Sequence, residues 1–253
     1  MDSQAPVTNE STASGKMHGE PSLMSVLASS CWNCEARTRT EIVYLIPHHD
    51  PALGLLSRLG FIQEPLQSPS NMVPLCPTCR ANFDSTVDPG FVFLPVDLKY
   101  FMQYEENDYQ NRCQQLLSGR KIEPRTFPTA RNYLDHQIKQ GVVRPTSTGG
   151  LYRRVFFKNF LPPATNMKHL ELPKTFNGSP IATIRRAFQA LGSLRCGAWS
   201  EVRDDLFKLQ GLYSRCLPET PDLQDLAKPK RSVNGTRVMV LKACRNRINN
   251  LPN

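Results

Sequence analysis

Apolar residues in the first half of the chain gather in short runs that end at proline or glycine. Residues 41–47 form an apolar, β-branched run that closes at a proline, and residues 91–95 form a second run of this kind. Runs of this length and composition predict short β-strands. Between them, residues 52–61 carry several leucines and predict a short helix that ends at Gly60.

Two further segments of the first half predict helices. Residues 77–84 are mostly polar, but Cys79 and Phe83 are four positions apart and would share one face of a short helix. Asp97 can cap a longer helix, in which apolar residues recur at helical spacing as far as residue 116. Much of one face of this longer helix is therefore expected to be apolar.

The second half of the chain predicts mainly helices. Residues 179–192 begin with Ser-Pro and end at glycine, which is typical of a helix with defined start and stop signals. Residues 200–215 have the apolar spacing of an amphipathic helix, whereas residues 151–157 favour a strand or the start of a helix. We therefore expect residues 120–253 to be a basic, mostly α-helical companion region.

The whole chain is expected to be an α+β protein with a disordered beginning. Residues 1–22 are rich in Ser, Thr, Glu and Gly and lack apolar periodicity, which predicts a disordered tail. No run reaches the length of about 18 apolar residues that a membrane span needs. The first residues also lack the charged and then apolar pattern of a secretory signal. We therefore expect an intracellular protein of the nucleus or cytoplasm with no membrane partner.

Four of the eight cysteines form two Cys-x2-Cys pairs, Cys31 with Cys34 and Cys76 with Cys79. Each pair can offer two sulfurs to one ion, and four thiolates suit a soft tetrahedral cation such as zinc, with no position left open for catalysis. Pro77 gives the second pair the Cys-Pro-x-Cys form common in zinc knuckles. Two disulfides or four unrelated cysteines are the alternative, but intracellular thiols stay reduced. The sequence therefore predicts one structural zinc site.

The residues around these pairs resemble the HNH nuclease family, in the ββα-metal form with a four-cysteine zinc that is common in fungal proteins. The similarity spans residues 31 to 113, and it implies a zinc-braced domain over residues 26–113. It also implies a catalytic divalent ion such as Mg²⁺ and nucleic acid as the substrate. The positions that match the family pattern in type and spacing are Asn71, Leu75, Cys76, Cys79, Phe83 and Asp84.

Two positions that carry the chemistry in this family differ here. Tyr44 stands where the family has its general-base His, and Arg80 stands where it has a metal-binding His. A phenol with a pKa of about 10 does not accept a proton from water at neutral pH. A guanidinium has no lone pair to give a metal. Together with Asn71 these residues form a degenerate catalytic set, so Mg²⁺-dependent cleavage is expected to be weak or lost.

His48 and His49 are candidates for a displaced base or metal site, with Asp84 as a further group. Pro47 and the turn that follows it interrupt the predicted strand, so we expect His48 not to share a face with Tyr44. The competing interpretation is a pair of solvated loop histidines.

Charge is divided unevenly along the chain, whose net charge is +9. The chain has 31 basic and 22 acidic residues. Residues 1–114 hold 7 of the basic and 13 of the acidic residues, so residues 115–253 hold 24 basic and 9 acidic residues. A basic half suits phosphate binding, although solvated helix faces would give the same composition. The candidate nucleic-acid-binding residues are Arg80, Arg185, Arg186, Lys228, Lys230 and Arg231.

Three functions of different classes are compatible with these features. The favoured one is a zinc-binding, HNH-like module that has lost catalysis and binds nucleic acid or protein. The second is an active metal-dependent endonuclease that uses His48, His49 and Asp84. The third is a structural interaction protein that does not bind nucleic acid.

Overall fold

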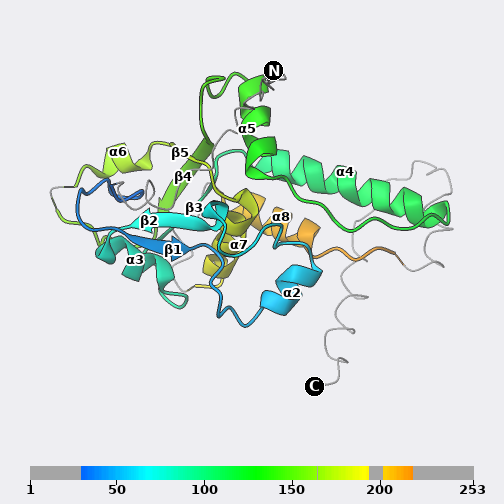
Figure 1. Cartoon of the computed structure of the whole chain (residues 1–253), viewed down its shortest axis with the longest axis horizontal. Coiled ribbons are helices and arrows are strands. Elements are labelled where there is room, and N and C mark those ends of the chain that lie inside the picture. The colour runs from blue at the N-terminus through cyan, green and yellow to red at the C-terminus, as the bar shows by residue number, and fades with distance from the viewer. Residues whose placement is uncertain (1–29, 164, 194–201, 219–253) are drawn as a thin grey trace, which may run out of the picture.

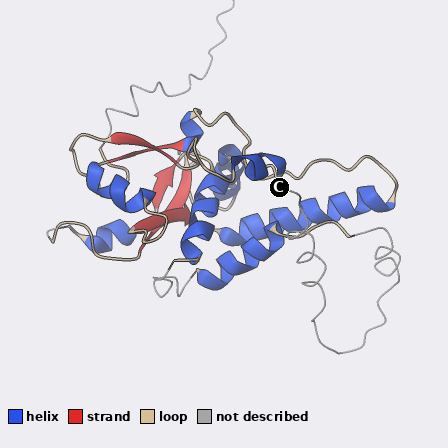
Figure 2. Ribbon diagram, turned by 90° about the horizontal axis from the view of Figure 1, so that it is seen from below, coloured by secondary structure: helices blue, strands red, loops and turns tan. Residues whose placement is uncertain are grey.

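The computed structural model describes residues 30–163, 165–193 and 202–218. These residues form a mixed structure of helices and short strands, in agreement with the expected α+β class. The strands gather in one part of the molecule, and α4 (Leu98–Leu117), the longest helix of the described residues, extends away from them (Figure 1 and Figure 2). The predicted disordered tail and the cluster Lys228, Lys230 and Arg231 lie outside the described residues.

The first sheet has two antiparallel strands, β1 (Glu41–Tyr44) and β2 (Met72–Leu75), with Val43 opposite Val73. The short helices α2 (Leu53–Arg58) and η1 (Pro69–Asn71) lie in the connection between them. Helix α3 (Pro77–Asp84) follows directly and contacts both strands. Strand β1 is shorter than the predicted strand, because the chain turns after Tyr44.

The second sheet joins the two halves of the chain. Its antiparallel order is β3 (Phe91–Pro95), β4 (Gly150–Phe156) and β5 (Lys174–Phe176). Strand β3 is the predicted strand of the first half, and it pairs with β4 along its whole length. Residues 120–253 therefore contribute two strands as well as helices: β4 confirms the strand option for residues 151–157, whereas β5 was not predicted.

Helices cover this second sheet and extend beyond it. Helix α7 contacts β3, α5 and α6 contact β4, and α4 packs along α8. The predicted caps are confirmed: the side chain of Asp97 accepts a hydrogen bond from the backbone of Tyr100, and Ser179 accepts one from Ala182. The bounds are α4 Leu98–Leu117, α5 Ala130–Lys139, α6 Met167–Glu171, α7 Pro180–Leu191 and α8 Arg203–Tyr213. No helix in the described part of the chain is long and apolar enough to cross a membrane.

Aromatic side chains connect the two sheets. The ring of Trp32, from the first Cys-x2-Cys pair, lies 4.3 Å from that of Phe93 on β3 and 5.6 Å from that of Phe176 on β5. Phe83 on α3 packs 5.8 Å from Phe93. All four side chains are buried. The cysteine-bearing segment is therefore anchored in the core of the second sheet.

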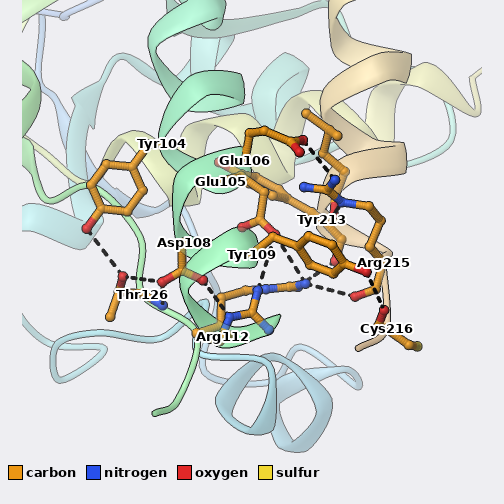
Figure 3. A network of polar contacts seen from close by, with 12 residues as sticks. Tyr104, Glu105, Glu106, Asp108, Tyr109, Arg112, Thr126, Tyr213, Arg215 and Cys216 are labelled. Carbon is orange, nitrogen blue, oxygen red and sulfur yellow. Dashed lines mark hydrogen bonds and ion pairs between the residues drawn. The ribbon is translucent and has the colours of Figure 1, made fainter. Parts of the chain in front are cut away.

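A charged cluster fastens the end of α8 to α4 (Figure 3). Glu105 on α4 is 1% exposed, and its carboxylate lies 3.5 Å from Arg112 and 3.3 Å from Arg125. Arg125 also donates hydrogen bonds to the backbone carbonyls of Tyr213 and Arg215, at 2.6 and 2.9 Å. The face of α4 that the sequence indicated to be largely apolar thus includes two buried ionisable side chains, Glu105 and Arg112.

The first prediction concerns the effect of this cluster on stability. Burial raises the pKa of Glu105 to about 7, although Arg125 and Arg112 oppose the shift. The folded protein then holds a proton that the unfolded chain releases, so the free energy of unfolding should fall as pH rises from the ordinary value of 4.5 to about 7. Glu105→Gln should remove this pH-dependent part of the free energy of unfolding, which is on the order of 2 kcal/mol between pH 5 and 8. Urea unfolding at several pH values would measure it.

Glu106→Gln is the matched control, because Glu106 lies on the same helix but its side chain is 39% exposed. Its pH profile should remain that of the wild type. A Glu105→Gln protein with an unchanged pH dependence of stability would contradict the assignment.

Candidate metal centre

The four paired cysteines meet at one point. The sulfur atoms of Cys31, Cys34, Cys76 and Cys79 all lie within 4.8 Å of one another, and those of Cys34 and Cys76 are 3.7 Å apart. None of the four forms a disulfide. Tetrahedral zinc with Zn–S bonds of about 2.3 Å places its sulfurs about 3.8 Å apart. The predicted convergence is confirmed: the four sulfurs lie close enough to hold one metal ion, and their spacing is compatible with structural zinc.

Backbone hydrogen bonds shape the first pair into a tight turn. The amide of Glu35 donates to the carbonyl of Cys31 at 2.9 Å, and the amide of Cys31 donates to that of Ala36 at 3.0 Å. Glu35 closes the turn with a φ of 62°. The amide of Trp32 donates to the carbonyl of Pro74 at 2.8 Å, which fixes this turn against β2 and close to the second pair.

The second pair lies where β2 passes into α3. Cys76 is the N-terminal cap residue of the helix, and Cys79 is on its first turn, with Pro77 at the first helical position. Cys79 and Phe83 are both buried, which confirms that they share the inner face of this helix. The junction between β2 and α3 therefore fixes the positions of the two sulfurs, and no long loop is involved.

The thiols already interact with one another. The pKa of Cys31 is far below its usual value because the thiols of Cys34 and Cys79 donate hydrogen bonds to its sulfur. The same interaction raises the pKa of Cys34 to about 11 and also raises that of Cys79, whose sulfur accepts a hydrogen bond from Asn33 Nδ2 at 3.3 Å. A metal ion would displace the remaining protons, because thiolates are the metal-binding form of cysteine.

Arg80, which stands where the HNH family pattern has a metal-binding His, forms ion pairs with two carboxylates. Its side chain is 47% exposed and contacts Glu41 on β1, and its Nε lies 3.4 Å from Asp84 on its own helix. Asp84 also lies 3.6 Å from Arg186. The guanidinium of Arg80 therefore contacts two carboxylates, one on β1 and one on α3.

Tyr44, which stands where the HNH family pattern has its general-base His, lies away from Arg80. Strand alternation puts it on the face of β1 opposite Glu41, which contacts Arg80. Its ring instead meets that of His48 edge-on, with centroids 4.8 Å apart. The strand ends before Pro47, as expected, but the turn that follows still brings the imidazole of His48 against Tyr44. His48 and His49 are both exposed.

Asn71 holds loops together. Its Oδ1 accepts a hydrogen bond from the amide of Ile46 at 2.9 Å, and its Nδ2 donates to the carbonyls of Ile46 and Leu66 at 3.0 and 2.9 Å. These bonds connect the end of β1, the loop before η1 and the start of β2. The buried side chain of Asn71 is thus occupied by backbone contacts.

Arg185 and Arg186 lie inside the protein. They are 7% and 6% exposed. Arg185 pairs with Asp50, and Arg186 donates to the carbonyl of Phe83 at 2.6 Å while lying over its ring. Helix α7 is buried on most sides, so two adjacent arginines in its sequence do not make a surface cluster. The exposed basic residues include Arg120, Lys121, Arg131, Lys139 and Arg144.

Sequence reasoning missed the residues that surround the cysteines. Arg154 on β4 donates a hydrogen bond to the backbone carbonyl of Asn33 at 2.7 Å, and Trp32 Nε1 donates to the carbonyl of Thr175 at 3.0 Å. Trp32 and Asn33 occupy the two positions inside the first pair, so their place in the motif was a signal that could have singled them out. Nothing in the local sequence distinguishes Arg154 from its neighbour Arg153.

Comparison of the chain with protein-family models, with curated proteins and with solved structures gave no match.

Proposed function

We propose that this chain is a zinc-braced, HNH-nuclease-like module that binds the phosphate backbone of nucleic acid without cutting it. The resemblance in sequence is supported by the order β1, β2, α3, in which an antiparallel pair is followed at once by a helix that packs on both strands. The cysteine cluster lies at the ends of these elements, where a ββα unit of this kind is braced.

Zinc is the ion that these residues fit best. Four thiolates at tetrahedral spacing leave no open position, so the ion supplies cross-linking and not catalysis. Cys31, Cys34, Cys76 and Cys79 would hold it, and Asn33 contributes an N–H to the sulfur of Cys79. In so small a unit, the free energy of zinc binding becomes free energy of folding.

The observation that carries the loss of catalysis is the position of Arg80. Its guanidinium pairs with both Glu41 and Asp84, and Arg186 lies 3.6 Å from Asp84, so permanent cations of the chain itself balance the charge of these two carboxylates. A divalent ion at the same place would be repelled by that charge and would find no free carboxylate. The phenol of Tyr44 cannot replace the missing general base at neutral pH.

Exposed cations of α5 and the loop after it support binding to phosphates. Arg131 and Lys139 are exposed on α5, and Arg144 is exposed in the following loop. Arg131 and Lys139 are eight positions apart on the helix, so they are offset by about 80° around its axis and lie on the same half of its surface. Exposed surface cations of this kind bind a charged backbone without reading its sequence.

The second prediction tests this binding. Fluorescence anisotropy with a labelled DNA duplex should show affinity that falls steeply between low and physiological salt. The triple variant Arg131→Glu, Lys139→Glu, Arg144→Glu should weaken binding at least tenfold and flatten the salt dependence, by about one unit of log–log slope for each phosphate that the protein no longer neutralises.

Lys168→Glu combined with Lys208→Glu is the control, because it changes charge at exposed positions on α6 and α8. It should reduce affinity much less. Absence of binding even in low salt would favour a structural interaction protein, and equal reductions of affinity in the two variants would remove α5 as the interface.

A further inference from the structure

We infer that Arg154 is the built-in counter-cation of the cysteine cluster and a positioning residue for it, which sets how firmly the centre retains its metal ion. The inference rests on the zinc site of the proposed function. It assigns to β4, far from the cysteines in sequence, a role in the metal centre.

The guanidinium of Arg154 is held behind the first cysteine pair. The residue is 6% exposed, and its Nη1 donates to the carbonyl of Asn33 at 2.7 Å. Its Nη2 donates to the carbonyls of Leu172 and His169, at 3.1 and 3.4 Å. The ring of Trp32 lies 6.0 Å from the guanidinium carbon. Bonds to three backbone carbonyls hold the charge at this position.

The partners of Arg154 set it apart from the other buried arginines. Arg112, Arg125, Arg185 and Arg186 each lie within 4.0 Å of a carboxylate. Among the described residues, no carboxylate lies within ion-pairing distance of Arg154, whose hydrogen bonds all go to carbonyls. A buried arginine without an ion-pair partner is costly unless another negative group is near.

Glu35 and the first cysteine pair supply that negative charge. Burial lowers the pKa of Arg154, and the nearby Glu35, Cys31 and Cys34 act in the opposite direction. The carboxylate of Glu35 is itself paired with Lys174 and His169. Zinc bound by four thiolates carries a net charge of about −2. A fixed cation behind the first pair therefore compensates part of this buried charge.

Arg154 also positions a hydrogen bond to sulfur. By fixing the carbonyl of Asn33, it holds the residue whose Nδ2 lies 3.3 Å from the sulfur of Cys79. N–H donors and cations around metal ligands lower the basicity of the thiolates and keep them bound. Because Arg154 stands opposite Phe93 in the β3–β4 pair, it couples the metal centre to the second sheet.

The test uses the full chain loaded with zinc, or with Co²⁺ as a spectroscopic substitute. The Arg154→Met protein should lose zinc to a chromophoric chelator at a rate about 10- to 100-fold higher than that of the wild type. It should also shift the sulfur-to-cobalt charge-transfer band. Arg154→Lys keeps the charge and should recover part of the retention. Asn33→Ala removes only the N–H donor and should speed release by a smaller factor, so it serves if Arg154→Met does not fold.

Arg125→Met is the matched control, because the side chain of Arg125 is only 10% exposed and is also bonded to backbone carbonyls, but it contacts the end of α8. It should destabilise the fold and leave the zinc release rate and the cobalt band unchanged. Arg154 variants that release zinc at the wild-type rate, with a wild-type cobalt spectrum, would overturn the inference. A wild-type chain that binds neither metal would instead overturn the proposed zinc site.

Discussion

Cys76→Ser is expected to unfold the part of the chain that contains β1, β2 and α3. Cys76 directly follows β2 and occupies the N-cap position of α3, so its sulfur joins the strand, the helix and the first cysteine pair. Structural zinc contributes about 10–16 kcal/mol to small domains, which equals or exceeds the whole stability of a typical domain. Removal of one thiolate should therefore abolish the native state of this part at 25 °C.

Backbone amide spectra and limited proteolysis would measure this unfolding, and a strong zinc chelator added to the wild type should reproduce it. Cys113→Ser is the matched control, because Cys113 is a partly buried free cysteine on α4 and does not belong to the cluster. It should keep the native spectrum and the zinc. A Cys76→Ser protein with native amide signals would show that the cysteines are not needed for the fold.

The second large effect is an absence of activity. Wild-type protein with Mg²⁺ or Mn²⁺ should leave supercoiled plasmid intact. Loss of a general base costs about 10²–10⁴ in rate, and loss of the catalytic ion removes the activation of water as well. Arg80→Ala should not restore cleavage, because it frees Glu41 and Asp84 without supplying a base.

His48 is the residue best placed to replace the missing base, because its ring lies against Tyr44. The comparison of His48→Ala with His49→Ala decides the matter, since both residues are exposed in the same loop and only His48 makes this ring contact. Robust wild-type cleavage that His48→Ala abolishes and His49→Ala preserves would place an active site beside Tyr44 and contradict the proposed function.

Elements with strong local signals could be predicted from the sequence. The caps Asp97 and Ser179 marked helix starts, and the positive φ of Gly60 follows the end of α2. The spacing of Cys79 and Phe83 gave the inner face of α3. Convergence of the cysteine pairs was predictable because four ligands of one ion must meet, whatever the fold between them.

Features that depend on partners distant in sequence could not be predicted. Arg154 and Arg186 look like surface cations, but tertiary contacts bury them against the first cysteine pair and Phe83. Glu105 interrupts an apolar helical pattern, and its partner Arg125 lies in a later loop. Strand β5 has only three residues and is formed through its pairing with β4.

The most direct test of this account is the metal content of the purified chain by native mass spectrometry. We expect one zinc ion per chain, released on denaturation with Cys31, Cys34, Cys76 and Cys79 all recovered as free thiols. A folded chain that carries no metal, or one whose four cysteines are recovered as two disulfides, would contradict it.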